Sequence, residues 1–396
     1  MKVMFYCQHV LGIGHLVRSA EIARALSRED DVTFVSGGAP VEGFPFPRGV
    51  TLVQLPALKT DEEFGALEDC GSGQTVEVIQ ELRRERLLSL FDQLRPDALV
   101  IELFPFGRKR FAFELIPLLE HAKSRSEETL VACSLRDILV EKPDAAKHEE
   151  RVCRIVNSYF DLILVHGDLA FQKLSETFHR AGDLQCDIRY TGLVQQEAPA
   201  PPTGSAPHDV TPSVVASIGS GRYRHGQILL ESVIRAAAQL ERKIAHRFRV
   251  FAGPFIPSEV YVALEQMARQ TRNVEIEKYS PHFIEHLRRA DLSISMGGYN
   301  TIMNILATGV RSLVYPYTAN DDLEQEIRAK KLANLGVVEL LHPEMLAAEV
   351  LAPKIAEMLA TKPARISFDM DGAPNTARIL RSAAVAKAEK LSGVSR

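Results

Sequence analysis

The chain has 396 residues, of which 46% are hydrophobic and 25% are charged. This composition is typical of a globular protein, and the length exceeds what one ordinary hydrophobic core holds. A formal net charge of -4, from 47 basic and 51 acidic side chains, excludes a global positive field for nucleic acid. Five scattered cysteines without a CxxC pair argue against a disulfide framework and against a structural zinc site.

No stretch of the sequence reaches the ~18 consecutive apolar residues that a membrane-spanning helix needs. The segment 1–26 joins one lysine to a short apolar run. His9, two glycines and a charged amphipathic continuation stand where an export signal has its small-residue cleavage site. We therefore expect a cytoplasmic protein.

The first half of the chain alternates short apolar runs with stretches of helical periodicity. Such alternation predicts a parallel, doubly wound sheet that helices cover on both faces. In chain order the expected elements are a strand at 2–8, a helix at 15–28, a strand at 32–38, a helix at 76–94, and strands at 98–104, 129–135 and 160–167.

A stretch with five prolines and no apolar period, residues 197–212, predicts a linker between two domains. After it the alternation restarts. We expect strands at 213–219, 247–253, 273–279, 291–296 and 312–317, separated by helices at 226–243, 258–270 and 283–289 and by a helical pattern that ends at Gly309. A helix at 323–336 follows the last of these strands.

The fold class is therefore α/β, with two doubly wound, Rossmann-like domains and a cleft between them. The N-terminal domain is expected at 1–196 and the C-terminal domain at 213–368. The segment 369–396 contains an Ala-rich helix that we expect to cross back to the N-terminal domain.

Glycine-rich loops follow three of the predicted strands. Gly297 and Gly298 lie between a buried strand and a helix, and Asn300 and Thr301 follow as good N-cap types. Glycine lets a backbone turn sharply and approach a ligand, and a helix N-terminus offers unpaired N–H groups, so this joint suits a phosphate or diphosphate. A purely structural turn is the alternative.

The other two loops are "VLGIGHLVR" and "SIGSGRYRHG", which stand at the carboxyl ends of predicted parallel strands, where such folds bind ligands. Neither matches GxGxxG with an acidic residue at the right distance, so a dinucleotide cofactor is not indicated.

Four motifs, "GIGHLVR", "SIGSG", "SMGGYNTIMNILATGV" and "DDLEQEIRA", resemble the GT-B glycosyltransferases, in the group whose C-terminal domain is similar to that of the MurG N-acetylglucosaminyltransferases. Three more, "ELFPFGRKRFAFELIPLLE", "CSLRDIL" and "YTGLV", resemble a branch of predicted glycosyltransferases. The resemblance covers nearly the whole chain.

The resemblance implies a nucleotide-diphosphate sugar donor, with UDP-sugar favoured, on the C-terminal domain and an acceptor on the N-terminal domain. It implies an inverting reaction without metal or cofactor. Two residues depart from the pattern, because Glu324 stands where MurG has a glutamine and Asn304 where the family has a glutamate for the ribose. The implied donor contacts are Gly219, Ser220, Gly221, Arg222, Tyr279, Phe283, Gly297, Gly298, Asn300, Thr301, Asn304, Asp322, Glu324 and Gln325.

Two residues are rival candidates for the base that activates the acceptor hydroxyl. His15 ends a glycine loop and begins a helix, where a structural cap is the alternative. Glu102 ends the strand at 98–104 among apolar residues that would raise the pKa of its carboxyl group, although a salt-bridged glutamate is equally compatible with the pattern.

A basic and aromatic run, "FPFGRKRFAF", suits an acceptor phosphate or an anionic membrane surface, while a solvated face is the alternative. The acceptor is expected to be a sugar, a lipid-linked compound or a small molecule, and peripheral contact with the inner face of the membrane is one hypothesis. The candidate acceptor or phosphate contacts are Gly12, Gly14, Arg18, Arg108, Lys109, Arg110 and Asp137.

Two apparent metal motifs are discounted. "HFIEH" at 282–286 fits a metalloprotease pattern, but no third ligand is suggested, and "DMD" at 369–371 follows no glycine loop. Two other functions stay open: a nucleotide-sugar hydrolase or epimerase on the same scaffold, and a non-catalytic protein that binds sugar nucleotides.

Overall fold

The computed structural model describes the chain except residues 10–13, 42–43, 61–65, 141–143, 198–211, 220–223, 317–322, 362–365 and 394–396. It divides into two compact units, one formed by Met1–Gln195 with Asp369–Arg396 and the other by Gln196–Phe368. Nearly all of the predicted linker at 197–212 lies outside the described residues.

The first unit contains a seven-stranded sheet in the order β3-β2-β1-β6-β7-β8-β9. All neighbouring strands in it run parallel. The strands are β1 (Lys2–Cys7), β2 (Asp31–Ser36), β3 (Val50–Gln54), β6 (Ala98–Glu102), β7 (Leu130–Arg136), β8 (Leu162–His166) and β9 (Asp187–Tyr190). A short antiparallel pair, β4 (Leu58–Thr60) and β5 (Leu67–Asp69), lies outside this sheet.

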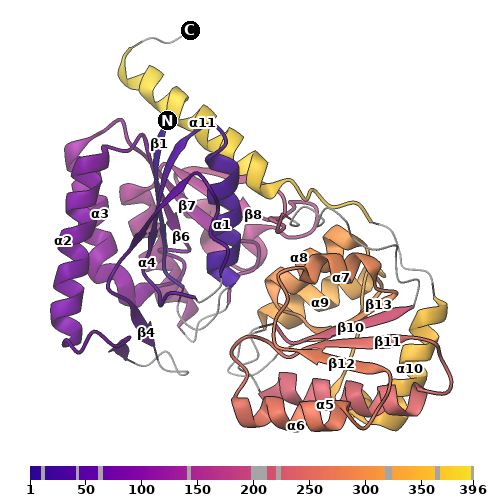
Figure 1. Ribbon diagram of the computed structural model, residues 1–396. Coiled ribbons are helices and arrows are strands. Elements are labelled where there is room, and N and C mark those ends of the chain that lie inside the picture. The colour runs from indigo at the N-terminus through magenta and orange to yellow at the C-terminus, as the bar shows by residue number, and fades with distance from the viewer. Residues whose placement is uncertain are drawn as a thin grey trace. The chain divides into compact units, whose positions relative to one another are not determined.

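Helices cover both faces of this sheet, as Figure 1 shows. Side chains alternate along β1, so that Met4 and Tyr6 join the core under α2, α3 and α4, whereas Phe5 and Cys7 join the core under α1 and α11. This double burial explains why the strands are continuous apolar runs in the sequence. The helices are α1 (Gly14–Leu26), α2 (Val76–Leu94), α3 (Ala112–Arg125), α4 (Ala145–Tyr159) and α11 (Gly372–Leu391).

A fully buried ion pair, Arg83 with Glu114, ties α2 to α3. Its guanidinium donates to both carboxylate oxygens at 2.7 and 2.8 Å, and Nη1 donates to the carbonyls of Gly37 and Pro56 at 2.7 Å each. Because the charges are paired and these donors are satisfied, the burial is tolerated. The pair fixes the loop after β2 against the helices.

The second unit contains a six-stranded sheet in the order β12-β11-β10-β13-β14-β15, again with parallel pairs. Its strands are β10 (Ser213–Ser217), β11 (Arg247–Phe251), β12 (Val274–Glu277), β13 (Leu292–Met296), β14 (Ser312–Tyr315) and β15 (Glu339–Leu340). One face carries α5 (Arg224–Leu240), α6 (Ser258–Ala268) and α10 (Ala348–Ala360), and the other carries α7 (Phe283–Arg289), α8 (Tyr299–Thr308) and α9 (Glu324–Asn334) (Figure 1).

The segment that begins at Asp369 belongs to the first unit, where α11 packs on α1. Leu193 N donates to Asp369 O at 2.7 Å, and a Cβ on Gly192 would lie 2.6 Å from the Asp369 carboxyl carbon. The Asp369 carboxylate accepts from Asp371 N at 3.0 Å and from Asn375 Nδ2 at 3.2 Å. Asp369 of the "DMD" motif therefore joins α11 to the end of the first sheet. Among the helices that the structure describes, none is long and apolar enough to cross a membrane.

Candidate functional site

The carboxyl ends of the central strands in the first unit bring polar side chains together. Glu102 ends β6, Arg136 ends β7 and His166 ends β8, while His9 follows β1. Parallel strands end at the same edge, and β1 pairs with β6, so α1 after β1 carries His15 and Arg18 to the same place.

His15 and Glu102, the two rival bases, form one hydrogen-bonded pair. His15 Nδ1 lies 2.6 Å from Glu102 Oε1, and Arg18 Nη2 donates to the same oxygen at 2.7 Å. The Glu102 side chain is 0% exposed and that of His15 is 20% exposed. The hydrogen bonds of the His15 ring to described residues involve Nδ1, and none of them involves Nε2.

The surroundings set opposite charge states for the two groups. Burial alone would raise the pKa of Glu102, but the charges of His15, Arg18 and Arg108 and the hydrogen bond from His15 lower it to about 2. Burial lowers the pKa of His15 to about 4 in spite of Glu102. At neutral pH the carboxylate is thus charged and the imidazole neutral, which is the state a general base needs. Of the two alternatives for Glu102, the raised pKa is wrong and the salt-bridged glutamate is confirmed, because the cations nearby outweigh desolvation.

Arg108 turns inward beside this pair. The backbone is left-handed at Leu103 (φ 65°) and at Arg108 (φ 57°), which reverses the chain directly after β6. Arg108 Nε is shielded from solvent and has no hydrogen-bond partner among the described residues. Burial lowers the pKa of the guanidinium although the charge of Glu102 opposes this, and Arg136 adds to the lowering. Lys109 and Arg110 are exposed. The basic run is therefore not one face, because its first cation points toward the interior.

The remaining acceptor candidates lie around this edge. Gly14 begins α1, and Gly12 lies outside the described residues. Asp137 is fully buried just after β7, where a Cβ on Gly167 would lie 2.8 Å from the Asp137 Cβ.

Sequence reasoning missed a buried chain of side chains, Ser134, His166 and Thr191. Ser134 Oγ lies 2.7 Å from His166 Nε2, and Thr191 Oγ1 lies 3.0 Å from His166 Nδ1. Burial, followed by the charge of Arg18, lowers the pKa of His166 to about 3. Because Ser134 and His166 lie in predicted strands near their carboxyl ends, a list of strand-end polar residues would have found both.

In the second unit, Gly297 and Gly298 join β13 to α8. Gly298 is the N-cap residue, with φ -60° and ψ 145°, and no side chain caps the helix. Asn300 and Thr301 lie within the first turn of this helix, so neither is its N-cap residue, and their role as donor contacts stays a prediction. Gly298 does not need glycine for its φ, and a Cβ there would meet nothing within 4 Å. The N–H groups of the first turn of any α-helix have no partner within the helix, so this helix start suits an anion.

The start of α9 lies beside this turn. A Cβ on Gly297 would lie 3.5 Å from Gln325 Cβ. Glu324 is buried and accepts from Arg328 Nη2 at 2.9 Å, and the Arg328 guanidinium lies 5.1 Å from the ring centroid of Tyr299. Gln325 therefore borders the glycine turn, and Tyr299 and Arg328 were not predicted.

Asn304 lies one turn further along α8 and is 3% exposed. Its Nδ2 donates to Gln196 Oε1 at 3.3 Å, while its buried Oδ1 accepts no hydrogen bond from any residue that the structure describes. A buried carbonyl oxygen without a donor is unusual in a folded protein and calls for one.

The other donor candidates differ in their surroundings. Gly219 follows β10 with a φ of 66°, which favours glycine. Tyr279 is 50% exposed, and the half-buried Phe283 packs edge-on against Phe251 at 5.2 Å. Ser220, Gly221, Arg222 and Asp322 lie outside the described residues.

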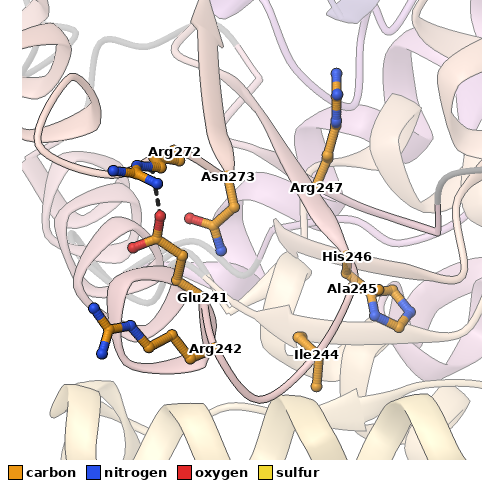
Figure 2. Close-up of a pocket in the computed structure, with 8 residues that line it drawn as sticks. All are labelled: Glu241, Arg242, Ile244, Ala245, His246, Arg247, Arg272 and Asn273. Atoms are coloured by element: carbon orange, nitrogen blue, oxygen red, sulfur yellow. Dashed lines mark hydrogen bonds between the residues drawn. The ribbon is translucent and has the colours of Figure 1, made fainter.

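A cavity of about 540 Å³ in the second unit lies away from these residues. Residues at the amino ends of β11 and β12 line this cavity. Within it, the backbone N of Arg272 donates a hydrogen bond to the Glu241 carboxylate at 3.1 Å (Figure 2). The glycine turn follows the carboxyl end of β13, at the opposite edge of the parallel sheet. Ligands of open α/β sheets bind at carboxyl ends, so we do not place the site in this cavity.

Within the described ranges, no group of three or more His, Cys, Asp or Glu residues is arranged to hold a metal ion. His286 of the "HFIEH" motif instead lies 3.2 Å from Ser280 Oγ and 3.3 Å from Arg249 Nη1.

Residues 225–383 match the model of the glycosyltransferase family 28 C-terminal domain. An uncharacterized glycosyltransferase of Methanosarcina acetivorans is 24% identical over 400 residues, or 98% of this chain and 99% of that protein. The UDP-N-acetylglucosamine--N-acetylmuramyl-(pentapeptide) pyrophosphoryl-undecaprenol N-acetylglucosamine transferase of Thermodesulfovibrio yellowstonii is 37% identical over 76 residues, or 19% of this chain and 21% of that protein.

Solved structures show the same fold. MurG of Acinetobacter baumannii has a TM-score of 0.53 at 14% identity, over 98% of this chain and 99% of that one. The spinosyn rhamnosyltransferase SpnG complexed with thymidine diphosphate has a TM-score of 0.56 at 17% identity, over 100% of both chains. These matches and the two parallel sheets confirm the predicted α/β fold of the GT-B class.

Proposed function

We propose that this chain, a glycosyltransferase of the MurG-like branch with the GT-B fold, transfers a hexose from a nucleoside-diphosphate sugar to a hydroxyl acceptor with inversion. The observation that carries the proposal is the His15 and Glu102 pair at 2.6 Å, at the carboxyl edge of the first sheet.

In this mechanism His15 Nε2 takes the proton of the acceptor hydroxyl. Glu102 accepts the hydrogen bond from Nδ1, which fixes the imidazole tautomer and stabilises the imidazolium that forms. Arg18 holds the carboxylate in place through its bond of 2.7 Å to the same oxygen. The two rival bases thus have different tasks, with His15 as the base and Glu102 as the residue that orients it.

The glycine turn at Gly297 and Gly298 would bind the donor diphosphate. The N–H groups of the first turn of α8 and the positive end of the helix dipole stabilise the charge that develops on the leaving group. This supports a reaction without a divalent ion or another cofactor, because the backbone supplies the stabilisation that a metal otherwise gives.

The donor base is proposed to be uracil. The relative from Thermodesulfovibrio yellowstonii is named for a UDP-sugar, which favours uracil, whereas SpnG is complexed with thymidine diphosphate, the competing base. The unpartnered Oδ1 of Asn304 would accept a hydroxyl of the ribose, in the position where the family carries a glutamate.

We also propose a cytoplasmic location with peripheral membrane contact for a lipid-linked acceptor. Lys109 and Arg110 are the exposed cations of the basic run. Flotation with vesicles that contain anionic lipid tests this, since replacing both residues by Gln should abolish flotation. Flotation that persists in this variant would refute the membrane proposal.

Thermal unfolding with UDP, dTDP, GDP, ADP and CDP tests the donor assignment. A ligand present at ~100 times its dissociation constant adds roughly 2.7 kcal/mol to the free energy of unfolding. We expect a selective shift with UDP, and equal or absent shifts with all five would contradict the assignment. Release of free sugar from UDP-sugars without an acceptor would favour the hydrolase alternative.

A further inference from the structure

Arg108 is a charged side chain that lacks a partner beside the proposed catalytic pair. Its Nε is fully shielded from solvent, and it forms no hydrogen bond or ion pair with any residue that the structure describes. Glu102 is the anion that acts on it most strongly, yet the carboxylate is joined to His15 and Arg18 instead. Arg108 is half-buried, and its shielded Nε is a donor without a hydrogen bond among the described residues, so a ligand oxygen is a natural partner for it.

The turn that precedes Arg108 has an unusual backbone conformation and a hydrogen bond that closes it. Leu103 and Arg108 both have a left-handed backbone, and Gly107 N donates to Leu103 O at 2.9 Å. A Cβ on Gly107 would lie 2.7 Å from Leu103 Cδ2, so a side chain there would require the Leu103 side chain to move. Non-glycine residues rarely adopt this backbone, and such conformations cluster at ligand sites.

The charges near Arg108 indicate the sign of the ligand. The charge of Arg136 acts on Arg108, and the charge of Arg18 acts on Glu102. Glu102 also accepts a hydrogen bond from Arg18. Glu102 is therefore shared among several cations. A guanidinium presents a planar fork of donors that matches a carboxylate or a phosphate.

We propose that the acceptor substrate carries an oxyanion group, a carboxylate or a phosphate, which Arg108 binds next to the hydroxyl that His15 activates. The inference rests on the proposed function. The anion is assigned to the acceptor because Arg108 lies on the same unit as the proposed base, His15. The charge of Arg108 also lowers the pKa of His15, so the two side chains interact. The donor diphosphate is the competing source of an oxyanion.

Binding of inorganic phosphate and of acetate to the full-length protein tests this, by isothermal titration calorimetry. The variants are Arg108→Gln and, as a matched control, Arg86→Gln, which removes an exposed cation of α2 in the same unit. We expect Arg108→Gln to weaken the binding of at least one probe by about tenfold or more, whereas Arg86→Gln leaves it unchanged. The tighter probe shows which oxyanion the site prefers.

A second readout separates a ligand role from a structural one. Because Arg108 makes no hydrogen bond or ion pair within the described residues, Arg108→Gln should leave the melting temperature nearly unchanged, and Arg108→Lys should restore part of the binding. A lowered melting temperature with unchanged phosphate and acetate binding would overturn the proposal. So would displacement of the bound probe by UDP, because it would assign the anion to the donor.

The donor assignment is checked in the same samples. UDP should shift the melting temperature of wild type and Arg108→Gln equally. If UDP binds but neither probe does, the oxyanion proposal fails while the proposed function stands. If UDP fails to bind wild type, the donor assignment itself fails.

Discussion

Replacing Gly298 by alanine should separate a phosphate turn from a structural one. The residue has φ -60°, which alanine adopts freely, and its Cβ would meet nothing within 4 Å. Alanine is a poorer N-cap than glycine by about 0.5–1 kcal/mol, while the less flexible unfolded chain returns about 0.4–1 kcal/mol. The free energy of unfolding should therefore change by less than about 0.5 kcal/mol.

Nucleotide binding should respond differently to the same change. The added methyl group projects into the space that the donor diphosphate would enter, and overpacking of this kind costs about 1–3 kcal/mol. We expect the dissociation constant of UDP to rise about 5- to 150-fold. Urea unfolding and calorimetric titration with UDP measure the two quantities.

Gly309→Ala is the matched control at the other end of α8. Gly309 is the C-cap residue with φ 68°, where alanine is strained. This variant should lose about 1–2 kcal/mol of stability and bind UDP as wild type does. Unchanged UDP affinity in Gly298→Ala would refute the phosphate assignment and leave the glycine pair as a turn.

Three further predictions follow from buried groups. Arg83→Met leaves the Glu114 carboxylate buried without its partner and should cost about 3–5 kcal/mol in urea unfolding, whereas the double variant with Glu114→Leu should recover much of it. The pKa of His15 is about 4 in the folded state against 6.5 in the unfolded chain, so the unfolded state binds the proton first as the pH falls. The free energy of unfolding should therefore decrease between pH 6.5 and 4. A free energy of unfolding that stays constant over this range would contradict the lowered pKa of His15. Glu102, at about 2 in the folded state against 4.5, should add a further loss below pH 4.5. Asn304→Ala should weaken UDP binding about tenfold with little change in melting temperature, and equal UDP affinity would remove Asn304 from the ribose site.

Much of the fold could be predicted from the sequence, because strands that are buried on both faces leave apolar runs such as that of β6. The edge strand β3 was missed, since only partial burial shapes its sequence. The site candidates His15 and Glu102 could be named separately, but their contact depends on β1 pairing with β6 across the sheet, where Tyr6 lies opposite Ile101. Long-range pairing of this kind leaves no local pattern.

Two errors in the candidate site have local physical causes. The composition of "FPFGRKRF" predicts one basic face, but the left-handed backbone at Arg108 turns that residue inward, and nothing in the residue type signals it. Asn300 and Thr301 are good N-cap types, yet Gly298 is the N-cap residue and the helix begins at Tyr299, so capping preference alone does not locate the start.

The transfer kinetics of His15→Gln test the central claim most directly. The full-length variant and wild type are compared with the nucleoside-diphosphate sugar that stabilises the protein and an acceptor that yields product. If His15 is the base, kcat should fall about 10²- to 10⁴-fold while the dissociation constant of the nucleoside diphosphate stays unchanged. A kcat within a few-fold of wild type would contradict the account and move the base to another residue.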